Sequence, residues 1–196
     1  LRELSYVDLS ENALTDEVDV LFAPAIQHAN FSHNKFTSFK QFKSFKRSHN
    51  TLHICDVSHN VIEQDISSIL KNIPPKLVQL DLSRNSLYGT LPEPLEYLQY
   101  IQQLSIASNK LSGGLPTFST LSTPNLQLLD LSNQEHGDDK GFSGVIPSGL
   151  STLPFLTKLS LAGNQLTGAI PSALGNLAQL KALDLSDNNL TDVIPV

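Results

Sequence analysis

The C-terminal part of the sequence contains an internal repeat with a shift of 24 residues, and this repeat constrains the fold more than any other feature. Segments 153–166 and 177–190 match at every leucine and at one asparagine. Both follow the frame L-x-x-L-x-x-L-x-L-x-x-N-x-L. A unit of this length cannot bury its apolar face alone, so neighbouring units must stack into one continuous core. The repeat therefore predicts a solenoid and not one or two globular domains.

Eight copies of the frame can be counted along the chain, each anchored on one amide side chain. The anchors are Asn12, Asn34, Asn60, Asn85, Asn109, Gln134, Asn164 and Asn188. The apolar residues before each anchor alternate with polar ones, which predicts a short strand with one buried face. We expect these strands to pair in parallel into a single curved sheet. We expect the anchor amide to satisfy backbone groups that leave the strand ladder.

A glycine and a proline follow the anchor in four of the copies, in the pattern Leu-x-Gly-x-Leu/Ile-Pro or a close variant. The glycines are Gly89, Gly113, Gly144 and Gly168, and the prolines are Pro92, Pro116, Pro147 and Pro171. Glycine accepts backbone conformations that other residues resist, and proline lacks a backbone N–H. We expect this return leg to contain no continuous strand or helix.

Segments 80–92 and 159–171, which carry both the leucine frame and the return leg, resemble the plant-type leucine-rich repeat. That family occurs in the extracellular portions of receptor-like kinases and receptor-like proteins, and in polygalacturonase inhibitors. The resemblance implies an α/β repeat solenoid, a right-handed horseshoe with a parallel β-sheet on the concave face and loops, 3₁₀ or short helical segments on the convex face. We expect one domain over 1–196 of about eight repeats, irregular over 1–73 and regular over 74–196, as a fragment of a longer chain.

Two stretches depart from the repeat. Residues 36–47 place phenylalanine at every third position with lysine and arginine between. This spacing predicts a 3₁₀ or loosely helical convex segment with the rings inward and the cations in solvent, although a basic patch for an acidic polymer or an anionic membrane is an alternative. Residues 135–140 form an acidic insertion that lengthens a turn, and their spacing matches no calcium loop.

Catalytic and cofactor signals are missing from the sequence. There is no His-Glu-x-x-His pattern, no cysteine pair for zinc and no cofactor motif. Cys55 falls in the buried apolar column, so we expect an inert core residue. A net charge of −6 gives no reason to expect nucleic-acid binding. We also expect no signal peptide, no transmembrane segment and no membrane contact by these residues, because no apolar run is long enough. We interpret the chain as a non-enzyme without cofactor or metal.

Ligand recognition is then expected on the concave face, where residues between the buried leucines point outward and stack in columns from strand to strand. One column consists of small polar residues that are ordinary for such a strand face, and another, at the turn before the anchor, changes identity from repeat to repeat. The candidate ligand-contacting residues are Tyr6, Asp8, His28, His33, His53, Asp56, His59, Gln79, Asp81, Arg84, Gln103, Ser105, Asp130, Lys158 and Asp184.

The histidines gather in repeats two and three. We expect His28, His33, His53 and His59 all to lie on the concave face near Asp56. Because histidine titrates near pH 6.5, such a group would give pH-responsive binding of an acidic ligand. Solvated histidines on a polar strand face are the simpler alternative.

Two N-x-S/T sequons begin at Asn30 and Asn189, and they matter only if the chain is secreted. A glycan on Asn30 would obstruct the histidine region.

By resemblance, the leading hypothesis is a protein- or peptide-binding ectodomain segment of a receptor-like protein or receptor kinase, located outside the cell or at its surface. The alternatives are a secreted inhibitor of a cell-wall-degrading hydrolase and a structural or surface-binding scaffold, including one that binds ice.

Overall fold

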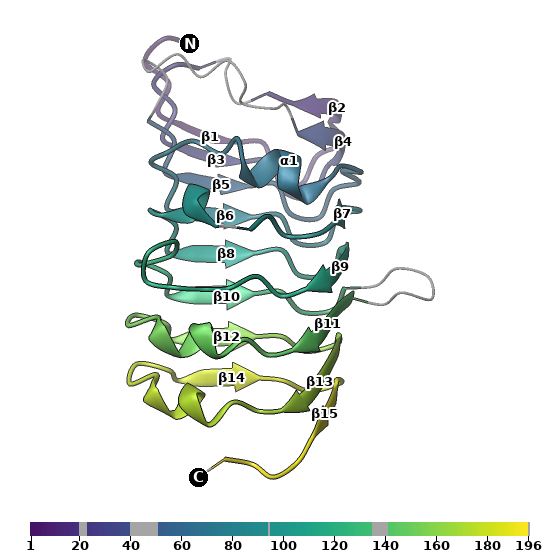
Figure 1. Ribbon diagram of the computed structural model, residues 1–196. Coiled ribbons are helices and arrows are strands. Elements are labelled where there is room, and N and C mark those ends of the chain that lie inside the picture. The colour runs from purple at the N-terminus through teal and green to yellow at the C-terminus, as the bar shows by residue number, and fades with distance from the viewer. Residues whose placement is uncertain (20–22, 40–50, 94, 135–140, 196) are drawn as a thin grey trace.

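The computed structural model describes residues 1–19, 23–39, 51–93, 95–134 and 141–195, which form a stacked solenoid of parallel strands (Figure 1). Its main sheet has eight strands in the order of the sequence, one for each predicted repeat. These strands are β1 (Tyr6–Asp8), β3 (His28–Asn30), β5 (Ile54–Asp56), β6 (Gln79–Asp81), β8 (Gln103–Ser105), β10 (Leu128–Asp130), β12 (Lys158–Ser160) and β14 (Ala182–Asp184). All neighbouring pairs are parallel and in register. The leucine-rich repeat architecture inferred from the frame is confirmed.

The core is a continuous spine formed by the middle residue of each strand and the apolar residues beside it. Leu80, Leu104, Leu129 and Leu159 are at most 2% exposed. The equivalent Leu183 in β14, the last strand of the sheet, is 44% exposed because a neighbouring strand covers it on one side only. Each fully buried leucine contributes about 1.5–3 kcal/mol before the loss of chain entropy is subtracted.

The anchor amides bond each repeat to the one before it, as the sequence predicted. Asn109 Nδ2 donates to the carbonyl oxygens of Ile106 and Ala107 in its own turn and to that of Leu82 in the preceding repeat, at 3.0, 3.2 and 3.0 Å. Its Oδ1 accepts the backbone N–H of Leu87, also in the preceding repeat, at 3.0 Å. One buried side chain thus satisfies four backbone groups that have left the ladder.

Gln134 fills the anchor position of the sixth repeat and makes the same set of bonds. Its Nε2 donates to three carbonyl oxygens, the nearest that of Ile106 at 2.9 Å, and its Oε1 accepts the N–H of Leu111 at 3.2 Å. The longer side chain is accommodated with 1% exposure. The amide group, and not asparagine as such, is therefore what the turn requires.

A second sheet runs along the return legs, and the expectation of one sheet and a strand-free return leg is wrong. It contains β7 (Tyr88–Gly89), β9 (Lys110–Gly114), β11 (Gly141–Val145), β13 (Gln165–Ala169) and β15 (Asn189–Thr191), stacked beside the main sheet (Figure 1). Glycine does not interrupt these strands because Gly113, Gly144 and Gly168 adopt φ values of 75 to 84° inside them. The prolines lie just beyond the strands and end them.

Among the described residues, four short helical segments lie on the remaining leg of the repeats, as the fold class implied. They are α1 (Ile66–Leu70), η3 (Glu96–Leu98), η4 (Ser148–Thr152) and η5 (Ser172–Asn176). Asp65 caps α1 by accepting the N–H of Ser68 at 3.0 Å. These segments lie across the interior from the main sheet and close the core on that side (Figure 1).

The helical interpretation of the phenylalanine stretch is wrong where the structure describes it. Lys35–Phe39 is strand β4, which pairs in parallel with β2 (Thr15–Val18) in a separate two-stranded sheet. Phe36 and Phe39 are both buried, so the inward direction of these rings is correct. A bulge in the pairing between Asp16 and Glu17 adjusts the register of the two strands. Residues 40–47 and the acidic insertion 135–140 lie outside the described residues.

Replacing an interior anchor should destabilise the solenoid by about 2–4 kcal/mol, because the substitution leaves several buried backbone groups without partners. We expect this loss for Asn109→Ala in urea unfolding followed by far-UV circular dichroism. Asn109→Gln should lose less, as Gln134 shows that the longer amide fits. The matched control is Asn12→Ala, because Asn12 is exposed and its side chain bonds to the carbonyl oxygens of Leu9 and Ser10 in its own turn. An equal loss for both alanine variants would contradict the anchoring role.

Candidate functional site

Two columns of side chains point to solvent on the exposed face of the main sheet, which corresponds to the predicted concave face. The strand register places Tyr6, His28, Ile54, Gln79, Gln103, Leu128, Lys158 and Ala182 in the first column. The second column contains Asp8, Asn30, Asp56, Asp81, Ser105, Asp130, Ser160 and Asp184. The second column is the one that the sequence aligned, residue for residue.

The carboxylates of the second column also hold the turn that follows each strand. Asp56 accepts the backbone N–H of Ser58 at 2.8 Å, and Asp81 accepts that of Ser83 at 2.8 Å. Asp130 accepts both the backbone N–H and the hydroxyl of Ser132. Short polar side chains commonly bond to the backbone two residues ahead in this way. One carboxylate oxygen of each thus has a structural role in the turn.

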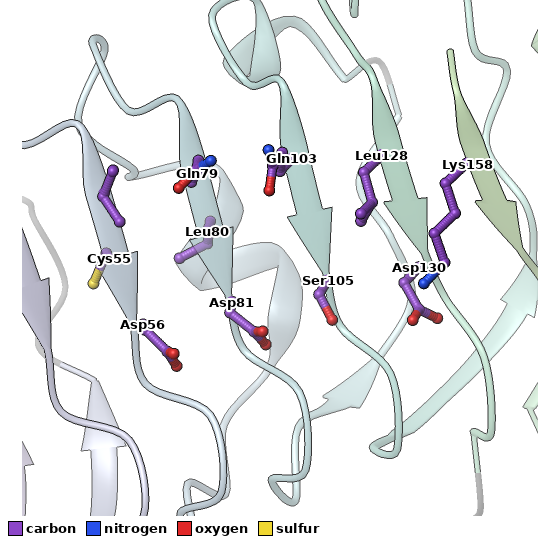
Figure 2. A pocket seen from close by; sticks show the side chains of 11 residues that line it. Cys55, Asp56, Gln79, Leu80, Asp81, Gln103, Ser105, Leu128, Asp130 and Lys158 are labelled. Atoms are coloured by element: carbon purple, nitrogen blue, oxygen red, sulfur yellow. The ribbon is translucent and has the colours of Figure 1, made fainter. Parts of the chain in front are cut away.

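A hollow of about 360 Å³ lies in the centre of this face, over β5 to β12 (Figure 2). Its lining residues are Ile54, Cys55, Asp56, Gln79, Leu80, Asp81, Gln103, Ser105, Leu128, Asp130 and Lys158. Amides, apolar side chains and Lys158 form the row at the start of the strands, and carboxylates and a hydroxyl form the row at their ends (Figure 2). Three carboxylates face one lysine, so the lining carries a net negative charge.

The predicted ligand-contacting residues divide among several places. Those that line the hollow are Asp56, Gln79, Asp81, Gln103, Ser105, Asp130 and Lys158. Tyr6, Asp8 and His28 lie on the same face at its N-terminal end, with the Tyr6 and His28 rings 6.2 Å apart in an edge contact. Asp184 lies at the C-terminal end, in β14.

The four histidines do not form one group, contrary to expectation. His53 lies one residue before β5 and lines a separate groove with Lys76, Tyr100 and Gln102. His33 and His59 lie in the turns after β3 and β5, and Arg84 lies in the turn after β6. A strand residue and a residue just before the strand point in different directions, which the spacing in the sequence did not reveal.

Ile54 and Leu128 line the hollow and were missed by the sequence analysis. Both occupy the first column, where a solvent-facing residue is expected to be polar, and both are half-buried. The signal was available, because an apolar residue at an outward position of the frame is an exception to the repeat. Their side chains give the hollow an apolar floor at the start of the strands.

Asp81 is the carboxylate whose pKa is most clearly affected by the surrounding face. Burial raises its pKa above the ordinary value, and the adjacent Asp56 raises it further, while hydrogen bonds from Ser83 lower it. Asp56 and Asp81 are register partners on neighbouring strands, so their charges lie side by side. A positively charged ligand group over this pair would relieve the repulsion.

Other sequence-derived candidates have structural explanations. Cys55 is 1% exposed and burial raises its pKa, so its thiol is held in the unreactive form. The Asn30 side chain bonds to Ser32 and Asp8, whereas Asn189 is exposed in β15. Use of either sequon stays a prediction.

Among the described residues, no group of three or more histidine, cysteine or acidic side chains is arranged to hold a metal ion. Within the same residues, no helix has the length and apolarity to span a membrane.

The in-register parallel strands, the ladder of buried amides and the second sheet define a leucine-rich repeat protein. Two leucine-rich repeat family profiles match, over residues 143–196 and 76–98. Receptor-like protein 18 of Arabidopsis thaliana is 36% identical over 159 residues, which cover 69% of this chain and 19% of that protein. The chain spans only 8 to 19% of the lengths of the curated relatives it matches.

Solved structures with the same fold include two plant proteins. The receptor kinase HAESA of Arabidopsis superposes with a TM-score of 0.81 and 26% identity, over 97% of this chain and 31% of that chain. A plant ice-binding protein superposes with a TM-score of 0.73 and 27% identity, over 96% of this chain and 58% of that chain.

Neutralising Asp81 should stabilise the protein at neutral pH. A raised pKa in the folded state means that its stabilising contribution is complete below the unfolded pKa, near 3.8, and is lost as pH rises through the folded pKa. We expect Asp81→Asn to raise Tm at pH 7 and the gain to disappear as pH falls below about 4, measured by differential scanning calorimetry. Asp130→Asn is the matched control because its column neighbours are Ser105 and Ser160. An equal gain in the control would show that the Asp56 charge has no role.

Proposed function

We propose that the hollow on the main sheet binds an extended peptide segment of a protein ligand, and that the chain is the recognition part of a receptor-like protein at the cell surface. The central observation is the hollow itself, with apolar and amide side chains along one edge and carboxylates along the other. An extended peptide lying across parallel strands would meet both rows at once. The face is preformed by the stacked repeats, which lowers the entropic cost of binding.

The similar structures support a peptide ligand. The HAESA ectodomain was solved with the peptide hormone IDA and the co-receptor SERK1, and the peptide hormone receptor RGFR1 was solved with RGF2. The curated relatives are named receptor-like proteins and a probable receptor-like kinase. The same similarity supports a cell-surface location.

The charge of the hollow narrows the class of peptide. Asp56, Asp81 and Asp130 line one edge, and Lys158 is the one cation among the lining residues. Burial already raises the pKa of Asp81, so a ligand cation placed there gains both the Coulombic attraction and the relief of repulsion from Asp56. We therefore expect ligands with lysine or arginine beside an apolar residue that packs on Ile54 or Leu128.

Selection of random peptides displayed on phage against the immobilised protein tests this proposal. Peptides enriched in lysine or arginine are expected, and their affinities can be measured by isothermal titration calorimetry. Leu128→Lys should weaken the selected peptides at least about tenfold, because a positive charge replaces the half-buried apolar contact and repels the cationic peptide. Val145→Lys is the matched control, as Val145 is 65% exposed on the second sheet. Failure to enrich any peptide, or equal loss in both variants, would reject the hollow as the binding surface.

A surface-binding scaffold is a second candidate, favoured by the similarity to a plant ice-binding protein. Ice binding requires a regular ladder of like side chains on a flat face. The rows of the second sheet are mixed, with Gly114, Ser143 and Gln165 in one row and Val145, Thr167 and Asn189 in the next. Peptide recognition therefore remains the better-supported function. Thermal hysteresis of a dilute solution of the protein distinguishes the two candidates, since a peptide-binding surface predicts none.

A further inference from the structure

The turn after each strand of the main sheet carries one residue in the left-handed backbone conformation. These residues are Glu11, His33, His59, Arg84, Ser108, Asn133, Gly163 and Asp187, with φ between 51 and 63°. We call this set the turn column. Gly163 shows that glycine fits the turn, and glycine is the residue that adopts this conformation most easily. The other repeats nevertheless keep a side chain there, and it is held in a fixed position at the rim of the strand face.

Within the turn column, His33 and His59 lie against each other. Their ring centroids are 3.9 Å apart and their planes differ by 14°, which is a stacked arrangement. Arg84 occupies the same position in the next repeat and is exposed. Neighbouring parallel strands are about 4.8 Å apart, so three groups that carry or accept a positive charge lie in successive steps along one rim.

The charges around this cluster are unbalanced. Burial, then His33, then Arg84 lower the pKa of His59, while Asp81 and Asp56 raise it more weakly. The two carboxylates accept backbone hydrogen bonds in their own turns, which reduces their capacity to neutralise the rim. Glu11 lies in the turn before His33, Lys35 follows Asn34 on β4, and Ser108 beyond Arg84 is uncharged. The net effect of these surroundings on His59 is to disfavour its charged form.

We propose that His33, His59 and Arg84 form a binding site for an oxyanion, either a carboxylate or a sulfate group, and that the site takes up protons as the anion binds. This site is separate from the acidic hollow and does not depend on the proposed peptide-binding function. The guanidinium of Arg84 is always charged and has the planar geometry that suits an oxyanion. The two imidazoles supply further donors once they are protonated.

The linkage between anion and proton follows from the stacked geometry. Without an anion, protonation of His59 is opposed by burial, by the stacked His33 ring and by Arg84. A bound anion supplies the missing countercharge, so protonation becomes favourable at a higher pH. Affinity is therefore greatest at pH values below the free-state pKa of His59 and decreases as pH rises through the bound-state pKa. The change is up to about tenfold per pH unit for each proton taken up.

Titration of the histidine ring signals by ¹H–¹³C NMR tests the proposal on the complete chain. The pH is varied from 5 to 8 in sodium sulfate, in sodium acetate and in sodium chloride at equal ionic strength. We expect sulfate or acetate to raise the titration midpoints of His33 and His59 relative to chloride. A shift in sulfate alone identifies a sulfate site, and a shift in acetate alone identifies a carboxylate site. No shift in either anion overturns the proposal.

Variants distinguish a specific anion-binding site from general screening of charges by salt. Arg84→Gln should remove most of the anion-induced shift while leaving the ring stack in place. His28→Gln is the matched control, because His28 contacts Tyr6 on the strand face and lies outside the pair; it should leave the shifts of His33 and His59 unchanged. Equal shifts at His28 and His59 in the unsubstituted protein, or unchanged shifts in Arg84→Gln, would refute the site.

Discussion

The anchor amide, which is buried in the interior repeats from Asn34 to Asn164 with the exception of the half-buried Asn85, is the interaction on which the rest of this solenoid depends. Its two ends bond to backbone groups of two repeats at once, as Asn60 does with Val57 in its own turn and with Phe31 and Phe36 in the preceding repeat. Leucine burial supplies most of the favourable free energy, but it is non-directional and does not fix one repeat relative to the next. The amide ladder provides that register, and the outward columns line up because of it.

Because equivalent residues of neighbouring repeats lie side by side, a difference at one or two positions changes the local chemistry of the strand face. A polar residue at an outward strand position resembles the polar residues beside it in the column. Ile54 and Leu128 differ from their column neighbours and make part of the strand face apolar. In the same way, Asp56 and Asp81 become a pair of repelling carboxylates only because their strands are in register. Recognition in such a fold therefore depends on which irregularities fall in adjacent repeats.

The sequence predicts the main sheet closely because its anchors are chemically distinct and the same leucine frame precedes each of them. The second column was aligned correctly for the same reason, from Asp8 to Asp184. The second sheet was missed because glycine and proline were interpreted as breakers, whereas Gly113 and Gly144 adopt positive φ within strands that pair with the neighbouring repeat. Phe36 was misassigned since a spacing of three residues resembles a helical turn, and pairing with β2 decided otherwise. His53 lies one residue before β5, and its direction depends on the exact residue at which that strand begins. Secondary-structure propensity does not locate the end of a strand to a single residue.

The exposed face of the main sheet carries an acidic hollow and, within a few residues of it, a rim with histidine and arginine side chains. The carboxylates of the second column line the hollow, and only three residues further along each chain segment the turn column presents His59 and Arg84. Asp56 and Asp81 bond to the intervening serine N–H groups, and they raise the pKa of His59 more weakly than burial, His33 and Arg84 lower it. A ligand with a cationic segment and an anionic terminus or side group would match both surfaces, and only in one orientation along the strands. Opposite charges at fixed separation therefore give this rigid face directionality, which apolar contacts alone do not provide.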